Sequence, residues 1–182
     1  MAEDSQTIYQ RFLSERTIFL RGLIDPYVST DIVAQLLYLE KDKPCNEIKL
    51  YINSRGGTVQ DGLAIYDTIN SIKSPVLTIC LGNACSMAAI ILLGGTKGHR
   101  CSLPNSQIMI HQPNQMIAGK ETDIANYAGQ LKEDRNRLEQ IISLHTGKPI
   151  TKVHADCEKD RYMTAQEAKD YGIIDHIITN IQ

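Results

Sequence analysis

Residues 76–93 read VLTICLGNACSMAAIILL. The first part, Val76–Leu81, is an apolar run of strand length and predicts a buried strand. The small residues Gly82–Cys85 predict a tight turn that leads into Ser86, and Met87–Leu93 is an apolar segment that predicts a helix. A strand that passes through a short turn into a helix is the repeating unit of α/β proteins. This stretch therefore indicates a sheet with helices packed against it.

Segments upstream of residue 76 repeat the alternation of helix and strand signals. Apolar spacing and turn residues predict, in chain order, an amphipathic helix over Ser5–Glu15, a strand over Thr17–Leu20, a helix that starts at Ser29–Asp31 and ends before Pro44, a strand over Glu47–Ile52 that Asn53–Gly57 breaks, and a helix from Leu63 to Ile72. The fold class predicted from this order is α/β.

Downstream, Gln107–His111 alternates as a strand does, and Thr122–Thr146 has the pattern of one long helix. Its apolar stripe, which Arg135 interrupts, needs a partner surface, while the middle of the helix is charged. We expect this helix to project from the body and to pack against another subunit. An ordinary surface helix of one domain is the alternative. Thr164–Glu167 predicts a capping box, and Gly172 predicts the end of the helix that follows.

Composition limits the class of protein. A chain of 182 residues is long enough for one domain that needs no disulfide or metal to fold. With a net charge of −2 and no dense basic block, nucleic acid is not an expected partner. The longest apolar run, Met87–Leu93, is far shorter than the ~20 residues that span a bilayer, so no membrane segment is expected.

The cysteines and histidines do not predict a metal site or a disulfide framework. The chain has five cysteines, none in CxxC spacing, and it has no HxxxH pair. Its start, Met1–Asp4, is acidic and polar, unlike a secretory signal. We therefore expect free thiols, no bound metal and a cytoplasmic location.

Four segments carry residues that suit hydrolytic chemistry. A hydroxyl nucleophile needs an imidazole in reach, a carboxylate that orients it, and backbone N–H groups for the oxyanion. Ser86, His111, Asp160 and the pair Gly56–Gly57 are the candidates for these parts. Each also has a structural interpretation: a helix-capping serine, a hydrogen-bonded histidine, a solvated charged loop and a plain turn. From the residues alone, both interpretations stay open.

Six segments together resemble the proteolytic subunit of the Clp protease, the ClpP family. They are Ile48–Gly57, Ile65–Thr68, Thr78–Met87, Leu103–Pro113, His145–Gly147 and Asp160–Asp175. The resemblance runs from about Ile8 to Ile178 without an evident gap.

The resemblance implies a role for each candidate residue of the site. Ser86 corresponds to the family's serine nucleophile, His111 to its general base, and Asp160 to the carboxylate that orients the base. The backbone N–H groups of Gly57 and Met87 correspond to the oxyanion hole. A serine endopeptidase that hydrolyses peptide bonds of unfolded proteins is the activity so implied.

The resemblance also implies an architecture and partners. The implied fold is ClpP/crotonase-like, with repeated ββα units in a single domain over residues 1–182, an N-terminal arm over 1–16 and a projecting handle region over about 112–146. Two heptameric rings would stack through the handles into a tetradecamer, with Glu158 and Lys159 at the ring–ring contact. A Clp-type AAA+ unfoldase would deliver substrate. Because no GxxxxGK[ST] loop occurs in this chain, no cofactor is expected here and ATP would act on that partner.

This sequence departs from the family pattern at several points. Arg55 stands where a proline usually precedes the two glycines, Asn114–Met116 replaces a small, glycine-containing stretch, and Lys159 takes the place of an arginine. The segment before Ile8 lacks the usual apolar-proline opening. These differences suggest a second isoform that works weakly alone or in mixed assemblies with a more typical subunit.

Three alternatives compete with a serine peptidase. One is a catalytically weak or structural ring subunit, against which the presence of all three side-chain types argues. Another is a crotonase-like acyl-CoA enzyme, which would not need Ser86 and His111 as a pair. The third makes Cys85 a thiol nucleophile, although we expect it to be a small buried filler that faces away from the Ser86 hydroxyl.

Overall fold

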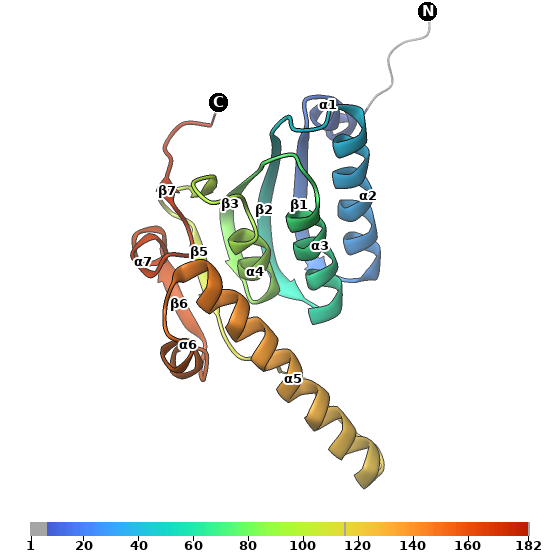
Figure 1. Ribbon diagram of the computed structural model, residues 1–182, viewed down its shortest axis with the longest axis vertical. Coiled ribbons are helices and arrows are strands. Elements are labelled where there is room, and N and C mark those ends of the chain that lie inside the picture. Colours follow the sequence, from blue (N-terminus) through green and yellow to red (C-terminus); the bar gives the residue numbers. More distant parts are fainter. Residues whose placement is uncertain (1–6, 115, 182) are drawn as a thin grey trace, which may run out of the picture.

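Seven strands form one sheet in the computed structural model, which describes residues 7–114 and 116–181 (Figure 1). The elements are α1 (Ile8–Ser14), β1 (Thr17–Ile24), α2 (Pro26–Asp42), β2 (Ile48–Gly57), α3 (Val59–Ser71), β3 (Val76–Cys85), α4 (Met87–Leu93), β4 (Arg100–Ser102), β5 (Gln107–Ile110), α5 (Glu121–Thr146), α6 (Ile150–Asp156), β6 (Arg161–Thr164), α7 (Ala165–Tyr171) and β7 (His176–Ile177). The predicted α/β class is confirmed.

The sheet is parallel except at one pair. Its main path is β1-β2-β3-β4-β7, while β5 pairs with the last residues of β3 and β6 runs antiparallel to β5. The first half of β3 thus borders β4 and its last three residues border β5. This division places the ends of β3 and β5 beside each other, and β6 beside β5.

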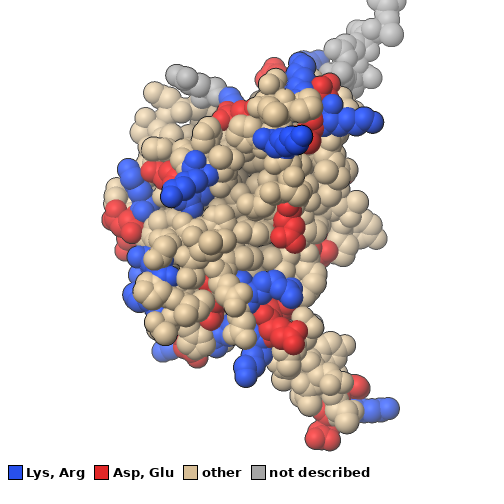
Figure 2. Space-filling model, in the orientation of Figure 1, with Lys and Arg blue, Asp and Glu red and all other residues tan. Residues whose placement is uncertain are grey.

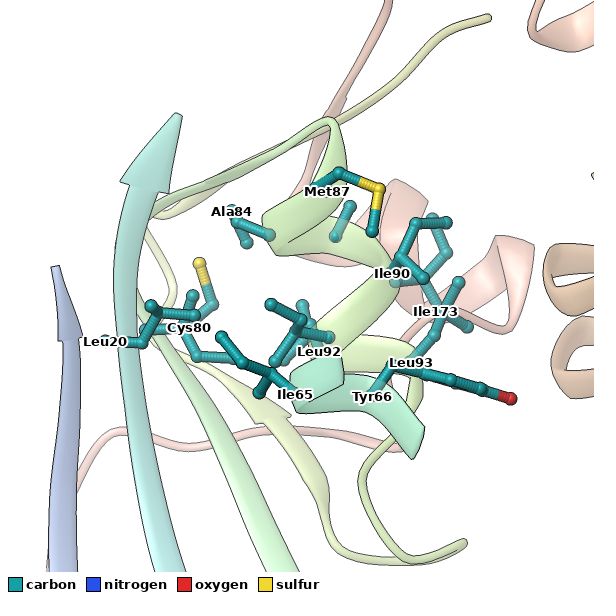
Figure 3. Packing of buried hydrophobic residues seen from close by; sticks show 14 of the residues in the cluster. Leu20, Ile65, Tyr66, Cys80, Ala84, Met87, Ile90, Leu92, Leu93 and Ile173 are labelled. Carbon is teal, nitrogen blue, oxygen red and sulfur yellow. The ribbon is translucent and has the colours of Figure 1, made fainter. Parts of the chain in front are cut away.

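Alternate residues of β1 and β2 face two different clusters. Ile18, Leu20, Leu50 and Ile52 belong to the main core, whereas Tyr51 and its neighbour Phe19 belong to a smaller cluster on the other face. All seven residues of α4 are buried. Figure 3 shows Met87, Ile90, Leu92 and Leu93 of this helix among side chains from α3 and the sheet. The helix that follows Ser86 is therefore held on every side by apolar packing.

The two predicted breaks in the central strands are wrong. Asn53–Gly57 stays within β2, and Gly82–Cys85 stays within β3. In β2 the pairing with β3 shifts register between Ile52 and Ser54, so the strand bends without ending. From β1 to α4, each single strand is followed by one helix. Repeated ββα units stay what the resemblance implies.

The start of α2 also differs from the prediction. Ser29–Asp31 lies inside the helix, which begins at Pro26. Asp25 caps it by accepting a hydrogen bond from the Val28 backbone N–H, and proline suits the first helical turn because it has no N–H to satisfy. The signal that could have located this start is the Asp25–Pro26 pair.

Several predicted boundaries are confirmed within a residue. The α4 helix covers Met87–Leu93, and α5 covers Glu121–Thr146. Thr164 and Glu167 form the predicted capping box of α7, and Gly172 ends that helix in the left-handed region, with a φ of 96°. The predicted N-terminal helix is present as α1, although residues 5 and 6, together with the rest of residues 1–6, lie outside the described part.

Helix α5 projects away from the sheet, as predicted (Figure 1). Its C-terminal half buries Leu138 and Ile142 in the core, whereas Ile124 and Tyr127 in the first turns are 43% and 51% exposed. That these exposed apolar side chains pack against another subunit stays a prediction.

Charges of both signs are interspersed on the face of the molecule that Figure 2 shows. None of the helices within residues 7–114 and 116–181 combines the length and apolarity needed to cross a bilayer.

Candidate active site

Strand pairing brings together three segments that are far apart in the sequence. Ser86 follows the end of β3, and its backbone N–H donates a hydrogen bond to the Met109 carbonyl of β5. His111 directly follows β5, and Ile110 pairs with Arg161, the residue after Asp160. The three candidate side chains therefore lie at the same end of three neighbouring strands, because β5 lies between β3 and β6.

Ser86, His111 and Asp160 form one line of hydrogen bonds. The His111 Nε2 atom lies 2.9 Å from the Ser86 Oγ, and its Nδ1 lies 3.0 Å from Asp160 Oδ1. In the tautomer that carries its proton on Nδ1, the ring donates to the carboxylate and accepts from the serine hydroxyl. This is the order of groups that makes a serine hydroxyl nucleophilic.

The backbone at Ser86 makes the sharp change from strand to helix. Its φ of 56° is unusual for a residue other than glycine. Its side chain forms no capping bond with α4, which rules out the interpretation of Ser86 as an ordinary capping serine. The hydroxyl is thus presented to His111 by a strained turn that the buried α4 helix holds in place.

Gly56 allows the last residues of β2 to approach this serine. Its φ is 96°, and a Cβ atom there would lie 2.7 Å from the Cys85 carbonyl oxygen and 2.8 Å from the Ser86 Cβ. Gly57 and Met87, the predicted oxyanion donors, line the same cavity as Ser86 and His111. Their role as donors stays a prediction.

The cavity beside the serine has a volume of about 240 Å³. Most residues of its wall are apolar, among them Met87, Ile90 and Leu138, and its polar side chains are those of Ser86, His111, Arg55 and Asn114. A concave apolar surface with a few polar groups at one side is typical of a ligand site. The arrangement suits the binding of an apolar side chain next to the Ser86 hydroxyl.

Cys85 does not take part in the hydrogen-bonded line. Its side chain is 5% exposed, and burial raises the pKa of its thiol. In the described part of the chain, the His111 ring bonds to Ser86 and Asp160. A buried thiol that stays protonated at neutral pH is a poor nucleophile, so Cys85 fits the predicted filler role.

Alkylation of the native protein by iodoacetamide is expected to modify Cys45 and to leave unchanged the peptide hydrolysis that the resemblance implies. Cys45 is exposed, whereas the other four cysteines are buried and burial raises their pKa values, to about 11 for Cys80 and about 12 for Cys157. Intact mass and peptide mapping would count and locate the adducts. Loss of activity in step with modification of Cys85 would contradict this assignment.

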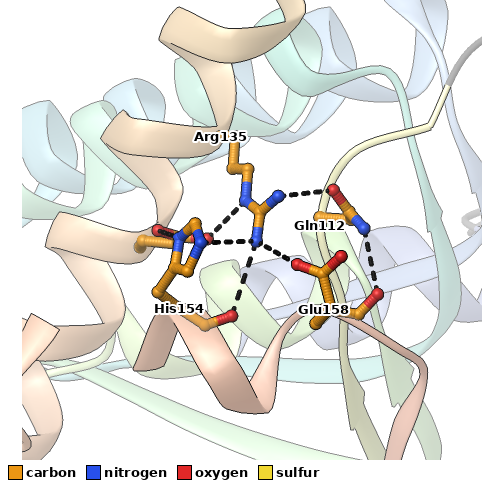
Figure 4. Close-up of polar contacts among 5 residues, drawn as sticks. Gln112, Arg135, His154 and Glu158 are labelled. Atoms are coloured by element: carbon orange, nitrogen blue, oxygen red, sulfur yellow. Dashed lines mark hydrogen bonds and ion pairs between the residues drawn. The ribbon is translucent and has the colours of Figure 1, made fainter. Parts of the chain in front are cut away.

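Glu158 and Lys159, the predicted ring contacts, lie just before Asp160 and are exposed. Glu158 accepts a hydrogen bond of 2.8 Å from Arg135 of the same subunit, and this contact holds the pKa of the Glu158 carboxyl below its usual value (Figure 4). The ring contact of both residues stays a prediction.

Sequence reasoning did not identify Arg135 as part of this region. The available signal was its position as a charged residue within an apolar stripe.

Among residues 7–114 and 116–181, no group of three His, Cys, Asp or Glu side chains is placed to hold a metal ion.

Comparison with known protein families identifies the family of this chain. A family model described as Clp protease matches residues 1–181. The match covers the three strand ends that carry Ser86, His111 and Asp160, the apolar cavity and the projecting α5 helix. The chain therefore belongs to the Clp protease family.

Proposed function

We propose that this chain is a serine endopeptidase, the proteolytic subunit of an ATP-dependent Clp protease, and that it hydrolyses peptide bonds of unfolded polypeptides. The observation that carries the proposal is the line of hydrogen bonds from Asp160 through His111 to Ser86, at the wall of an apolar cavity. Family membership makes peptide hydrolysis the expected reaction.

The proposed reaction starts with proton transfer from the Ser86 hydroxyl to His111 Nε2. The Ser86 Oγ attacks the carbonyl carbon of the scissile bond, and the N–H groups of Gly57 and Met87 stabilise the oxyanion that forms. Protonated His111 then gives its proton to the amine nitrogen, and the C–N bond breaks. Asp160 keeps the ring oriented and stabilises the imidazolium.

The second half of the reaction removes the acyl group. A water molecule gives a proton to His111 while its oxygen attacks the Ser86 ester carbon. The C–O bond to Ser86 breaks, the new carboxyl end leaves, and Ser86 regains its proton from His111. No metal or organic cofactor takes part in these steps.

We further propose that the chain works in two stacked heptameric rings. The exposed Ile124 and Tyr127 of the projecting helix, and Glu158 and Lys159 next to the site, are the candidate contacts between rings. A Clp-type AAA+ unfoldase would deliver substrate and use the ATP. All five cysteines are free thiols, which fits the proposed cytoplasmic location.

The test is native mass of the purified protein together with cleavage of a short fluorogenic peptide that has an apolar residue before the scissile bond. The proposal expects a tetradecamer that releases the fluorophore. An assembled particle without cleavage would instead favour the structural ring subunit of a mixed assembly with a second isoform. Turnover of acyl-CoA without peptide cleavage would favour a crotonase-like enzyme.

Arg55 is expected to favour substrates with an acidic residue near the scissile bond. Arg55 is exposed and lines the cavity, and none of the residues that line the cavity is acidic. In the described part of the chain, Arg55 forms no ion pair. An exposed ion pair of 0.5–1 kcal/mol corresponds to a preference of about two- to fivefold in kcat/KM. Paired peptides that differ by Glu or Lys at one position measure it.

The variant Arg55→Gln should remove this preference, and added salt should weaken it in the original protein. Arg11→Gln, which changes an exposed arginine on α1, is the matched control. An unchanged ratio of Glu to Lys peptides in Arg55→Gln would show that Arg55 does not select substrate.

A further inference from the structure

Arg135 occupies the point where α5 leaves the body of the subunit. Its side chain is 18% exposed, and its guanidinium lies between the segment after His111 and the loop before Asp160 (Figure 4). Five N–H groups in a plane allow arginine to bind several acceptors at once. The position of Arg135 thus permits one side chain to contact both segments.

On the side of His111, the partner of Arg135 is Gln112. The Arg135 Nη1 donates to Gln112 Oε1 at 2.8 Å. The same glutamine donates from its Nε2 to the Glu158 carbonyl at 2.9 Å and from its backbone N–H to the Cys157 carbonyl at 2.7 Å. Gln112 is therefore bonded both to Arg135 and to the loop that carries Asp160.

On the side of Asp160, the partner of Arg135 is the Glu158 carboxylate. The Arg135 Nη2 donates to Glu158 Oε2 at 2.8 Å, and the same nitrogen lies 3.5 Å from the His154 carbonyl oxygen. Both acceptors lie a few residues before Asp160 along the chain. The guanidinium thus bridges the two segments that supply the histidine and the aspartate.

The guanidinium is itself held in a fixed orientation. Its Nε donates to Glu139 Oε1 at 2.7 Å, one helical turn further along α5. Glu139 is 4% exposed, and its second oxygen lies 2.9 Å from His154 Nδ1. A charge-assisted contact with a buried carboxylate restricts the rotamers of Arg135. This contact therefore orients the guanidinium toward Gln112 and Glu158.

Asp160 needs such support because its own surroundings restrain it little. Its side chain is 53% exposed, and within residues 7–114 and 116–181 its Oδ2 has one long contact, 3.5 Å from the Tyr162 hydroxyl. Arg161, the next residue, donates to Asp156 at 3.0 Å and so joins the two ends of the 157–160 segment. The position of the carboxylate relative to His111 therefore depends on how the 157–160 segment is held.

We propose that Arg135 is a positioning residue that sets the distance and orientation between His111 and Asp160 by binding Gln112 and Glu158 at the same time. This inference rests on the proposed function, since it concerns the same three catalytic side chains. It assigns a role to the residue that interrupts the apolar stripe of α5.

The variant Arg135→Lys tests the proposal. Lysine keeps the positive charge next to Glu139, but a compact ammonium group cannot contact Gln112 and Glu158 in the geometry of the planar fork. A displacement of about 1 Å in a catalytic group can lower turnover by roughly 10²-fold. We expect kcat to fall roughly 10- to 100-fold, with KM within about twofold of the original value.

Arg137→Lys is the matched control, because Arg137 lies on the same helix, is 53% exposed and contacts Asp134 at 3.7 Å. Glu158→Gln is a second variant at an exposed position, where folding should tolerate the change; it should lower kcat in the same direction by a smaller factor. Melting temperature and native mass would be measured for each variant. Equal kcat values for Arg135→Lys and Arg137→Lys would overturn the proposal.

Hydrogen exchange provides a readout that does not depend on turnover. Arg135→Lys should speed amide exchange at Gln112 and in residues 157–160, and Arg137→Lys should not. Unchanged exchange would contradict the proposal even in an inactive protein. If the original protein cleaves no peptide while exchange responds as expected, the proposed function fails and the positioning role of Arg135 stands.

Discussion

Replacing Ser86 with alanine is expected to lower peptide hydrolysis by about 10⁴-fold or more and to leave the fold intact. The Ser86 hydroxyl makes no capping bond to α4, so its loss removes the nucleophile without removing a structural contact. The backbone bond from the Ser86 N–H to Met109 is retained. The measurement is kcat/KM on a fluorogenic peptide, with melting temperature and native mass alongside.

The control for this variant is Ser71→Ala, which makes the same chemical change at an exposed serine at the end of α3. It should keep full activity. If Ser86→Ala retained more than a few per cent of the original kcat/KM, water attack without a covalent intermediate, or another nucleophile, would have to replace the proposed mechanism.

Gly56→Ala is expected to lower kcat by roughly 100-fold and to lower the melting temperature as well. The added Cβ would lie 2.7 Å from the Cys85 carbonyl oxygen, 2.8 Å from the Ser86 Cβ and 3.0 Å from the Met87 backbone nitrogen. None of these atoms lies at the end of a flexible side chain. The end of β2 and the proposed nucleophile must therefore move apart, which disturbs the proposed oxyanion site.

Gly98→Ala separates this steric effect from backbone strain. Gly98 has a similar φ of 87°, yet a Cβ there would meet nothing within 4 Å. Both variants are destabilised by about 1–2 kcal/mol because alanine must adopt a left-handed backbone conformation. Only Gly56→Ala also adds a steric clash next to Ser86. Comparable kcat values for the two variants would show that the close approach of Gly56 to Ser86 has no catalytic importance.

Local signals explain which parts of the fold were predictable from the sequence. The wholly apolar run of α4 and the capping box at Thr164 act within a few residues, and both elements have the predicted bounds. The continuations of β2 and β3 were missed because glycine and asparagine are typical of turns. Here Ser54, whose Oγ donates to the Gly22 carbonyl at 2.6 Å, helps the bent strand to stay paired with β1.

The candidate site depends on long-range pairing that local patterns do not reveal. His111 and Asp160 meet because β5 and β6 pair antiparallel across 49 residues of sequence. Composition around Asp160 predicted a solvated charged loop, and its carboxylate is indeed half exposed. The residues alone left Asp160 open between an orienting carboxylate and a solvated loop, and the resemblance to a family favoured the first. No local pattern revealed the bridge made by Arg135.

The most direct test of the central claim is labelling of the assembled, folded protein with a fluorophosphonate, followed by peptide mapping. The account predicts one covalent adduct on the Ser86 Oγ, formed far more slowly in His111→Gln because the imidazole no longer takes the hydroxyl proton. An assembled particle in which Ser86 stays unlabelled, or in which loss of His111 leaves the labelling rate unchanged, would contradict it.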